Sequence, residues 1–452
     1  MRLRKTITTI VATAILLAGW QLFAVIANQP ELIPSLPRLV RTLCEWLVSG
    51  SFYQSVGATI LRGVLGMSIS FVCAIGMAGL FARFEWVYEL FRPLLAIMRS
   101  IPVISFILLA LIFLNPESIP LMIAFLTMFP LLTENLTRGI LDLRPGLSIM
   151  ARQFHIRRSN VLFQIIYPQL KPFLYSGLAS AAGFGWRAII MGEVLSQCAF
   201  GIGSEMKRAQ NFIAVPELLA WTIVAVFISF FFDKGISKVA DITPKISFAN
   251  EDQTIPTPTL SVLDTKDISY QYGIQHFSHS FQKGIIYGIS APSGKGKTTL
   301  LNLIGGILLP TEGEIHPTRH FGIATIFQQP QLLPHLTAEE NIILPLSSFL
   351  TEEKARRIAQ KHLQEMEMEP FGNRYPKELS YGQQQRIAIA RALAYPSPLL
   401  LMDVPFKGLD EALSHRIIER IREKQMKEER IILFTSHNPD EIRLLADEVI
   451  YL

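Results

Sequence analysis

A glycine-rich segment offers the clearest chemistry in this sequence. Glycines let backbone N–H groups curl around phosphate oxygens, and a helix that starts at the end of such a loop adds its positive dipole end. Lys297 is expected to reach the β- and γ-phosphates of ATP, and the Thr298 hydroxyl is expected to ligate Mg²⁺. The candidate nucleotide-binding residues of this segment are Ala291, Pro292, Ser293, Gly294, Lys295, Gly296, Lys297, Thr298 and Thr299.

The segment departs from the usual phosphate-loop pattern at its first position, where Ala291 stands in place of glycine. If this position needs a left-handed backbone, alanine costs about 1–2 kcal/mol there. Taken alone, the segment is also compatible with a glycine-rich turn that binds nothing.

Five further segments follow in order along the chain. They are Ile326-Phe-Gln-Gln-Pro330, Leu379-Ser-Tyr-Gly-Gln-Gln-Gln-Arg386, Leu399-Leu-Leu-Met-Asp403, Gly408-Leu-Asp410 and Thr435-Ser-His437. With the phosphate loop, this set resembles the ATP-binding cassette (ABC) family, whose motifs are called Walker A, Q-loop, signature, Walker B, D-loop and H-switch. The match covers nearly all of residues 260–452. It argues against the alternative, an unrelated phosphate-loop domain.

The resemblance implies roles for individual residues. Asp403 would hold Mg²⁺ through water, and Gln328 would sense the metal and transmit its state to a membrane domain. His437 would contact the γ-phosphate. The catalytic candidates are therefore His437, Gln328 and Asp403, and the metal candidates are Thr298, Gln328 and Asp403.

The resemblance also implies contacts made at the far ends of the nucleotide. Ser380, Gly382 and Gln383 belong to the signature, which would face the γ-phosphate of ATP bound to an opposite subunit. Tyr272 resembles the aromatic residue that stacks on adenine, and a tyrosine of the protein core is the alternative.

Two positions depart from the family pattern. Val404 stands where the family has a glutamate that orients or deprotonates the attacking water, and valine can do neither. Tyr381 stands where the signature usually has glycine. ATP binding is therefore expected, whereas two readings of hydrolysis stay open: slow turnover supported chiefly by His437, or a complete site supplied by a partner subunit.

The composition separates a membrane half from a water-soluble half. The chain is 50% hydrophobic with a net charge of +5, but long uncharged apolar runs are confined to the first 240 residues. The basic residues form no tract, so no nucleic-acid partner is expected. The three cysteines have no paired spacing, which argues against a disulfide framework or a metal site.

Six apolar runs predict six transmembrane helices in contact with membrane lipid. They cover residues 6–27, 64–81, 93–114, 118–133, 172–197 and 218–232. The first could be mistaken for a signal peptide, but its 22 uncharged residues are long enough to span a bilayer. Basic residues concentrate after the second, fourth and sixth runs, which predicts cytoplasmic N- and C-termini in the cytoplasmic membrane of a prokaryote.

Residues 241–261 are rich in Pro, Thr and Asn and predict an extended linker. Beyond it, β-branched runs alternate with helical patterns, as in an α/β domain with a parallel sheet. The expected domains are a helical membrane permease (1–240), the linker (241–261) and an α/β P-loop nucleotide-binding domain with a helical subdomain (262–452).

Parts of the membrane half resemble the permeases of nitrate-, sulfonate- and taurine-type ABC importers. The resemblance rests on Arg99–Phe106, on residues 151–172 and on Gly183–Glu193. It implies that residues 149–172, around His155, dock on the ATPase, and a solvated loop is the alternative. Arg187 and Glu193 lie six residues apart in the fifth run and do not share a helix face, so each could serve either the pathway or helix packing.

Together these features predict a half-transporter that works with a second copy or a similar half, binds ATP and Mg²⁺, and imports a small solute delivered by an extracytoplasmic solute-binding protein. The resemblance offers nitrate, sulfonates, taurine and vitamin-precursor pyrimidines as solutes. Export is a rival, although exporters usually have longer cytoplasmic helices. A regulatory or slow-cycling ATP-binding subunit that needs a hydrolysis-competent partner is the alternative from another class.

Overall fold

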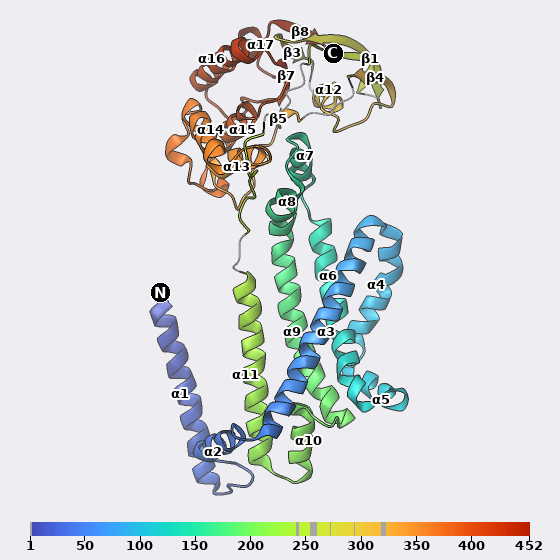
Figure 1. Ribbon diagram of the computed structural model, residues 1–452, viewed down its shortest axis with the longest axis vertical. Coiled ribbons are helices and arrows are strands. Elements are labelled where there is room, and N and C mark those ends of the chain that lie inside the picture. Colours follow the sequence, from blue (N-terminus) through green and yellow to red (C-terminus); the bar gives the residue numbers. More distant parts are fainter. Residues whose placement is uncertain (1, 241–243, 254–259, 272, 293, 318–321) are drawn as a thin grey trace. The chain divides into compact units, whose positions relative to one another are not determined.

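The computed structural model describes residues 2–240, 244–253, 260–271, 273–292, 294–317 and 322–452 (Figure 1). The chain forms two compact units. The first comprises residues 1–143 and 169–243, and the second comprises residues 144–168 and 244–452.

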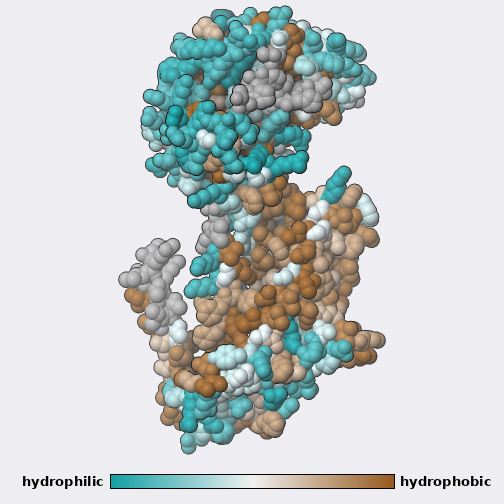
Figure 2. All heavy atoms as spheres, in the orientation of Figure 1, coloured by the Kyte–Doolittle hydropathy of each residue, from teal (hydrophilic) through white to brown (hydrophobic). Residues whose placement is uncertain are grey.

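The first unit is entirely helical in its described residues. Its helices are α1 (Arg2–Ala27), α2 (Leu36–Trp46), α3 (Gly50–Arg83), α4 (Glu85–Ser100), α5 (Val103–Phe113), η1 (Pro116–Ser118), α6 (Ile119–Leu141), α9 (Tyr167–Ser196), α10 (Ile202–Asn211) and α11 (Val215–Ala240). Figure 2 shows a largely hydrophobic surface over the long helices of this unit. Such a surface suits lipid or a further protein rather than water.

Within the described residues, four helical stretches are long and apolar enough to cross a membrane: Gly50–Arg83, Pro116–Leu141, Arg158–Ser196 and Val215–Ala240. The expected third span is instead the pair α4 and α5, bent by 94°. Pro102 stands at this break, where the ring removes a backbone donor. The apolar part of α1, Val11–Ala27, is shorter than these stretches. The prediction of six regular spans therefore becomes four, or five if the bent pair counts as one.

Small residues bring the long helices close together. The buried face of α3 carries residues at three- and four-residue spacing, mostly small: Ser55, Thr59, Gly63, Gly66, Ser70, Ala74, Ala78 and Phe81. A Cβ atom at Gly66 would lie 2.6 Å from the Cβ of Ala124 on α6. This close approach replaces the hydrophobic driving force that lipid removes.

The second unit contains a parallel sheet with strand order β5-β6-β7-β3-β8. These strands are β5 (Ala324–Ile326), β6 (Leu399–Asp403), β7 (Ile431–Thr435), β3 (Ile286–Ser290) and β8 (Glu448–Tyr451). Every residue of β5, β6 and β7 is buried, as expected for parallel strands covered on both faces. A separate antiparallel sheet has the order β2-β1-β4, from Ile274–Gln282, Val262–Tyr270 and Glu312–His316.

Helices complete the second unit. α12 (Lys297–Ile304) follows β3, and α13 (Ala338–Leu346), α14 (Glu352–Glu365) and α15 (Tyr381–Ala394) pack on one another as a helical subdomain. α16 (Glu411–Glu428) and α17 (Pro439–Leu445) come later in the chain. The predicted fold class, a helical permease joined to an α/β P-loop domain with a helical subdomain, is confirmed.

Two segments from outside the predicted nucleotide-binding domain (262–452) belong to the second unit. Residues 144–168, which include α7 (Pro145–Gln153), α8 (Arg158–Asn160) and a π-helical turn (Val161–Ile166), pack with it. Residues 244–253, part of the predicted extended linker, are hydrogen-bonded to the end of α13: Ala249 N–H donates to Ser347 O, and Gln253 N–H donates to Phe349 O. Backbone groups without regular structure still need such partners, and here α13 supplies them.

Candidate functional site

The glycine-rich loop joins the carboxyl end of β3 to α12. Gly294 and Gly296 have φ angles of +82° and +90°, a region that favours glycine. A Cβ atom at Gly296 would also lie 2.6 Å from the carbonyl oxygen of Gly273. Ala291 is not among the residues with positive φ, so alanine carries no left-handed cost at that position. Ser293 and Tyr272 lie outside the described residues.

Lys297 is held against the backbone of this loop. Its Nζ donates to the carbonyl oxygens of Ala291 (2.7 Å) and Pro292 (3.3 Å), and its side chain is buried. The ammonium is therefore fixed at the loop backbone, whereas Lys295 is exposed and Thr299 is half-buried on α12.

Thr298 and Asp403 meet at the carboxyl edge of the sheet. The Thr298 hydroxyl donates to Asp403 Oδ2 (3.0 Å), and the Thr435 hydroxyl, from the neighbouring strand β7, donates to Asp403 Oδ1 (2.8 Å). Within the described residues there is no cluster of three His, Cys, Asp or Glu suited to a metal. Mg²⁺ takes few protein ligands and completes its shell with water and phosphate oxygens, so this hydroxyl–carboxylate pair fits the ion.

A cavity of about 280 Å³ brings the three metal candidates together. Thr298, Gln328 and Asp403 line it, and Gly146 and Ile149 of α7 line it as well. Residues 144–168, called the docking segment from here on, thus border the cavity that the metal candidates line.

Val404 has a φ angle of +48°, which is a rare conformation for a β-branched residue. Its N–H donates to the Thr435 hydroxyl at 3.0 Å, which holds this backbone next to Asp403. The strain is of the order of 1–2 kcal/mol. The position is therefore held by its surroundings, but it carries no group that could act on water. His437 is exposed after β7, and in the described residues it makes no hydrogen bond to Asp403.

The signature residues form the start of α15. Ser380 and Gln383 cap this helix reciprocally: the Ser380 side chain accepts from Gln383 N–H, and the Gln383 side chain accepts from Ser380 N–H. A Cβ atom at Gly382 would lie 2.4 Å from the Gly408 carbonyl oxygen, so glycine is needed for contact with the D-loop. The helix N-terminus is preformed within one chain.

Tyr381 makes a contact that the sequence did not predict. Its hydroxyl donates to the carbonyl oxygen of Gln328 at 2.6 Å, and its ring lies against Gly408. Burial raises the pKa of its hydroxyl. A glycine could not link the signature helix to the Q-loop in this way.

Gln153, at the end of α7, is a buried amide that joins three elements. Its Nε2 donates to Gly305 O at the end of α12 (2.7 Å), and its Oε1 accepts from the Thr325 hydroxyl of β5 (3.3 Å). Its backbone carbonyl accepts from Ile323 N–H (2.7 Å). The docking segment is therefore hydrogen-bonded to both the phosphate-loop helix and the strand before the Q-loop.

Arg391 connects the same segment to the signature helix. This fully buried guanidinium on α15 donates to Pro330 O and Gln331 O, both at 2.9 Å. Its Cζ lies 5.4 Å from the ring centre of Phe154, which is itself fully buried. Burial lowers the pKa of Arg391 to about 9. The Arg391 guanidinium thus contacts both the end of the Q-loop and the Phe154 ring of the docking segment.

Asn160 fixes the other end of the docking segment. Its Nδ2 donates to Ser247 O and to the Ser347 hydroxyl, each at 2.8 Å, and its Oδ1 accepts from Ser247 N–H. Sequence reasoning named His155 for this surface, but His155 is exposed and its neighbours Gln153 and Phe154 are buried. A sequence shows no signal for a polar side chain that becomes buried only against another domain.

The two charged residues of the predicted fifth run, Glu193 and Arg187, have different surroundings. Glu193 is fully buried near the end of α9 and accepts from Thr59 (3.0 Å), Arg62 (2.8 Å) and the N–H of Gly203 (2.9 Å). Cβ atoms at Gly201 and Gly203 would lie 2.6 and 2.7 Å from its side chain, so only glycine fits over it. Glu193 therefore serves helix packing.

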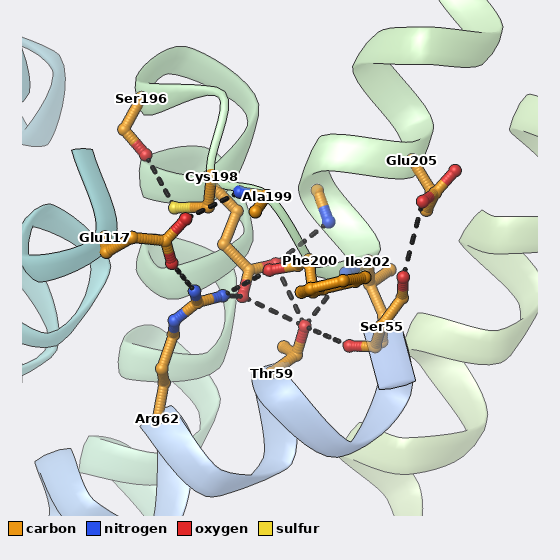
Figure 3. Close-up of polar contacts among 12 residues, drawn as sticks. Ser55, Thr59, Arg62, Glu117, Ser196, Cys198, Ala199, Phe200, Ile202 and Glu205 are labelled. Atoms are coloured by element: carbon orange, nitrogen blue, oxygen red, sulfur yellow. Dashed lines mark hydrogen bonds and ion pairs between the residues drawn. The ribbon is translucent and has the colours of Figure 1, made fainter. Parts of the chain in front are cut away.

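Arg62 extends this cluster to further elements (Figure 3). It donates to Phe200 O (2.7 Å) and to Glu117 (2.5 Å), and Glu117 accepts in turn from Ala199 N–H (2.6 Å). The cluster joins the turn between α9 and α10 to α3 and to η1, which directly precedes α6. Arg187, the other charged residue of the fifth run, is not part of it.

These observations define a membrane permease unit joined to a P-loop nucleotide-binding unit. A family model described as ABC transporter matches residues 274–407, and one described as binding-protein-dependent transport system inner membrane component matches residues 68–233. The chain belongs to the ABC transporter family.

Several proteins resemble the nucleotide-binding part. A thiamine import ATP-binding protein of Yersinia pseudotuberculosis is 34% identical over 205 residues, 42% of this chain and 86% of that protein. An Fe(3+) ions import ATP-binding protein of Rhizobium etli is 35% identical over 189 residues, 40% of this chain and 54% of that protein. The chain thus spans about half the length of the first curated relatives it matches. A dimeric cassette solved with ADP and phosphate is 32% identical, with 42% of this chain and 94% of that chain covered and a TM-score of 0.40.

The Gln153 contacts predict a local effect of removing this amide. Gln153→Ala leaves the Gly305 carbonyl and the Thr325 hydroxyl without a buried partner, which costs about 1–3 kcal/mol. Hydrogen–deuterium exchange of the peptides at the end of α12 and in β5 should accelerate roughly tenfold or more. Arg152→Ala, at the exposed neighbour, should leave both peptides unchanged. Equal exchange in the two variants would show that Gln153 does not join these elements.

The permease cluster predicts that Glu193→Gln destabilises the first unit. The substitution leaves the Arg62 charge with only the half-exposed Glu117, and breaking a buried ion pair costs about 3 kcal/mol. The thermal unfolding midpoint in lipid nanodiscs should fall, while Glu217→Gln, at an exposed site on α11, should not change it. The double variant with Arg62→Gln should lose less than the sum of the two single variants. Additive losses would argue against a coupled pair.

Proposed function

We propose that this chain is one half of an ATP-driven importer that moves a small solute across the cytoplasmic membrane. The carrying observation is the docking segment: residues 144–168 continue directly from α6 and into α9, yet Gln153, Phe154 and Asn160 are anchored in the ATPase unit. A change at the Q-loop therefore has a covalent and hydrogen-bonded route to two membrane helices.

Import is supported by the permease family model, which describes binding-protein-dependent transport, and by relatives named for import. An extracytoplasmic solute-binding protein would deliver the solute, and both termini would lie in the cytoplasm. The permease resemblance favours nitrate, sulfonates, taurine or vitamin-precursor pyrimidines. The relatives' names cover Fe(3+), thiamine and glucose and do not narrow this choice.

A second copy or a similar half would complete the transporter. In one chain, the start of α15 contacts the Q-loop and the D-loop, through Tyr381 and Gly382. The family pattern has these residues meet ATP on an opposite subunit. Closing two such ATPase units around ATP and Mg²⁺ would place Ser380, Gly382 and Gln383 against the partner's nucleotide.

Val404 supports a second candidate, a regulatory or slow-cycling subunit that binds ATP and needs a hydrolysis-competent partner. Asp403, Thr298 and Thr435 form the metal side of the site, but position 404 provides no base. ATP binding without ATP hydrolysis is therefore a possible behaviour of this chain, and the two can be measured independently.

ATP turnover by the full chain in lipid nanodiscs tests the proposal, with Lys297→Ala as the control that removes the phosphate-binding ammonium. Turnover above that control indicates a working assembly of identical chains. ATP binding without turnover supports the second candidate. If the unaltered chain does not bind ATP in the presence of Mg²⁺, both the importer proposal and the second candidate are contradicted.

Val404→Glu should raise the turnover rate about 100-fold if the water lacks only its base, because a positioned general base contributes roughly 10²–10⁴. Val404→Gln is the matched control, since the amide has similar size but cannot take a proton. Steady-state phosphate release measures both. An unchanged rate in the glutamate variant would show that another group limits hydrolysis.

A further inference from the structure

Arg187 is the charged group of α9 that the permease cluster leaves out. It is exposed in the chain, its Nε donates to the Gly183 carbonyl of its own helix (3.2 Å), and its guanidinium lies 5.5 Å from the ring centre of Phe184. No carboxylate of the described residues forms an ion pair with it, whereas Arg62 and Glu193 are paired. Its charge is thus uncompensated within the described part of the unit.

Arg187 lies well inside the span. Nine residues separate it from the end of α9 at Ser196 and fifteen from Pro172, which at 1.5 Å per residue is roughly 14 and 22 Å. The hydrocarbon core of a bilayer is about 30 Å thick. A guanidinium exposed to lipid at this depth is costly, so such groups face a water-filled path or the interior of an assembly.

The face of α9 that carries Arg187 is less apolar than the exposed face of α11. Between Arg187 and the N-terminal half of α9, four residues of this face are small or polar and are exposed or half-buried: Ser176, Ala179, Ser180 and Gly183. The exposed apolar side chains of Phe184 and Met191 flank Arg187 on the same face. A Cβ atom at Gly183 would meet nothing within 4 Å. By contrast, the exposed residues of α11 include Val226, Phe227, Phe230 and Phe231. The Arg187 face has room and polarity that α11 does not offer.

We propose that this face of α9 lines the aqueous solute pathway and that Arg187 binds a negatively charged group of the solute. This rests on the proposed transport function and adds a chemical class to it. A guanidinium matches the paired oxygens of a carboxylate, sulfonate or phosphate, and the Phe184 ring beneath it limits its orientation. The backbone bond to Gly183 uses only Nε and leaves the outer nitrogens to face such a group.

The test introduces a cysteine one helical turn from Arg187 and measures how fast it reacts with an anionic and with a cationic reagent. In the full chain in nanodiscs, with exposed Cys44 and Cys73 replaced by serine, a cysteine introduced by Gly183→Cys is reacted with two thiosulfonates of similar size. One reagent carries a sulfonate and the other a trimethylammonium group. The anionic-to-cationic rate ratio should fall about tenfold in Arg187→Gln and stay high in Arg187→Lys, because one nearby charge acts oppositely on the two reagents.

Val226→Cys, on the exposed face of α11, is the matched control and should react with neither reagent. The parent with only buried Cys198 sets the background. Absence of reaction at position 183 would mean that lipid or a helix covers this face and would overturn the proposal. Reaction with a ratio independent of residue 187 would overturn the role of Arg187. The assay uses no ATP, so its failure is distinct from a failure to transport, which turnover measures.

Discussion

The organisation of the ATPase unit depends on one buried cation. Arg391 is surrounded by the carbonyl oxygens of Pro330 and Gln331 and by the ring of Phe154. A buried charge without these partners would be strongly destabilising. Separating the signature helix, the Q-loop and the docking segment from one another is therefore unfavourable. Gln153 adds the phosphate-loop helix to the same group of elements. The Q-loop and the docking segment are therefore joined through the same buried side chain.

The candidate nucleotide site contains side chains suited to binding a metal but lacks a general base at position 404. The adjacent parallel strands β6 and β7 end at one edge of the sheet, where Asp403 and Thr435 meet Thr298 of α12, the helix that follows β3. The same edge holds Val404 in a conformation that a β-branched residue resists. The backbone geometry of the site is thus maintained although the side chain for deprotonating water is absent. Nucleotide binding and hydrolysis are separable physical questions here.

Two charged residues of α9, Glu193 and Arg187, have different surroundings in the permease unit. Glu193 and Arg62 satisfy each other, with Thr59 and backbone N–H groups completing the shell, and they bind the α9–α10 turn to its neighbours. Arg187, less than two turns away along α9, has no such shell among the described residues. In a low-dielectric surrounding an unpaired charge is expensive, and this contrast separates a packing role from a role at a water-filled surface.

The sequence by itself determined the local features. The glycines at 294 and 296 suit a loop with positive φ angles, and uniformly apolar runs such as 399–402 and 431–434 predict buried parallel strands. Apolar length identified the membrane half, although Pro102 broke one expected span, because hydropathy does not register a bend. The order of the nucleotide-site segments along the chain carried the resemblance to the ABC family.

Only the tertiary structure decided the long-range contacts. Gln153, Asn160 and Arg391 are ordinary polar residues in the sequence, and they gain a packing role because folding buries them against segments 60 to 187 residues away. Likewise, Arg187 and Glu193 are indistinguishable as two charges in one apolar run until the packing of α3 covers one and leaves the other exposed. A charge or amide acquires its role from the partners and the solvent around it, and residue spacing along the chain does not specify either.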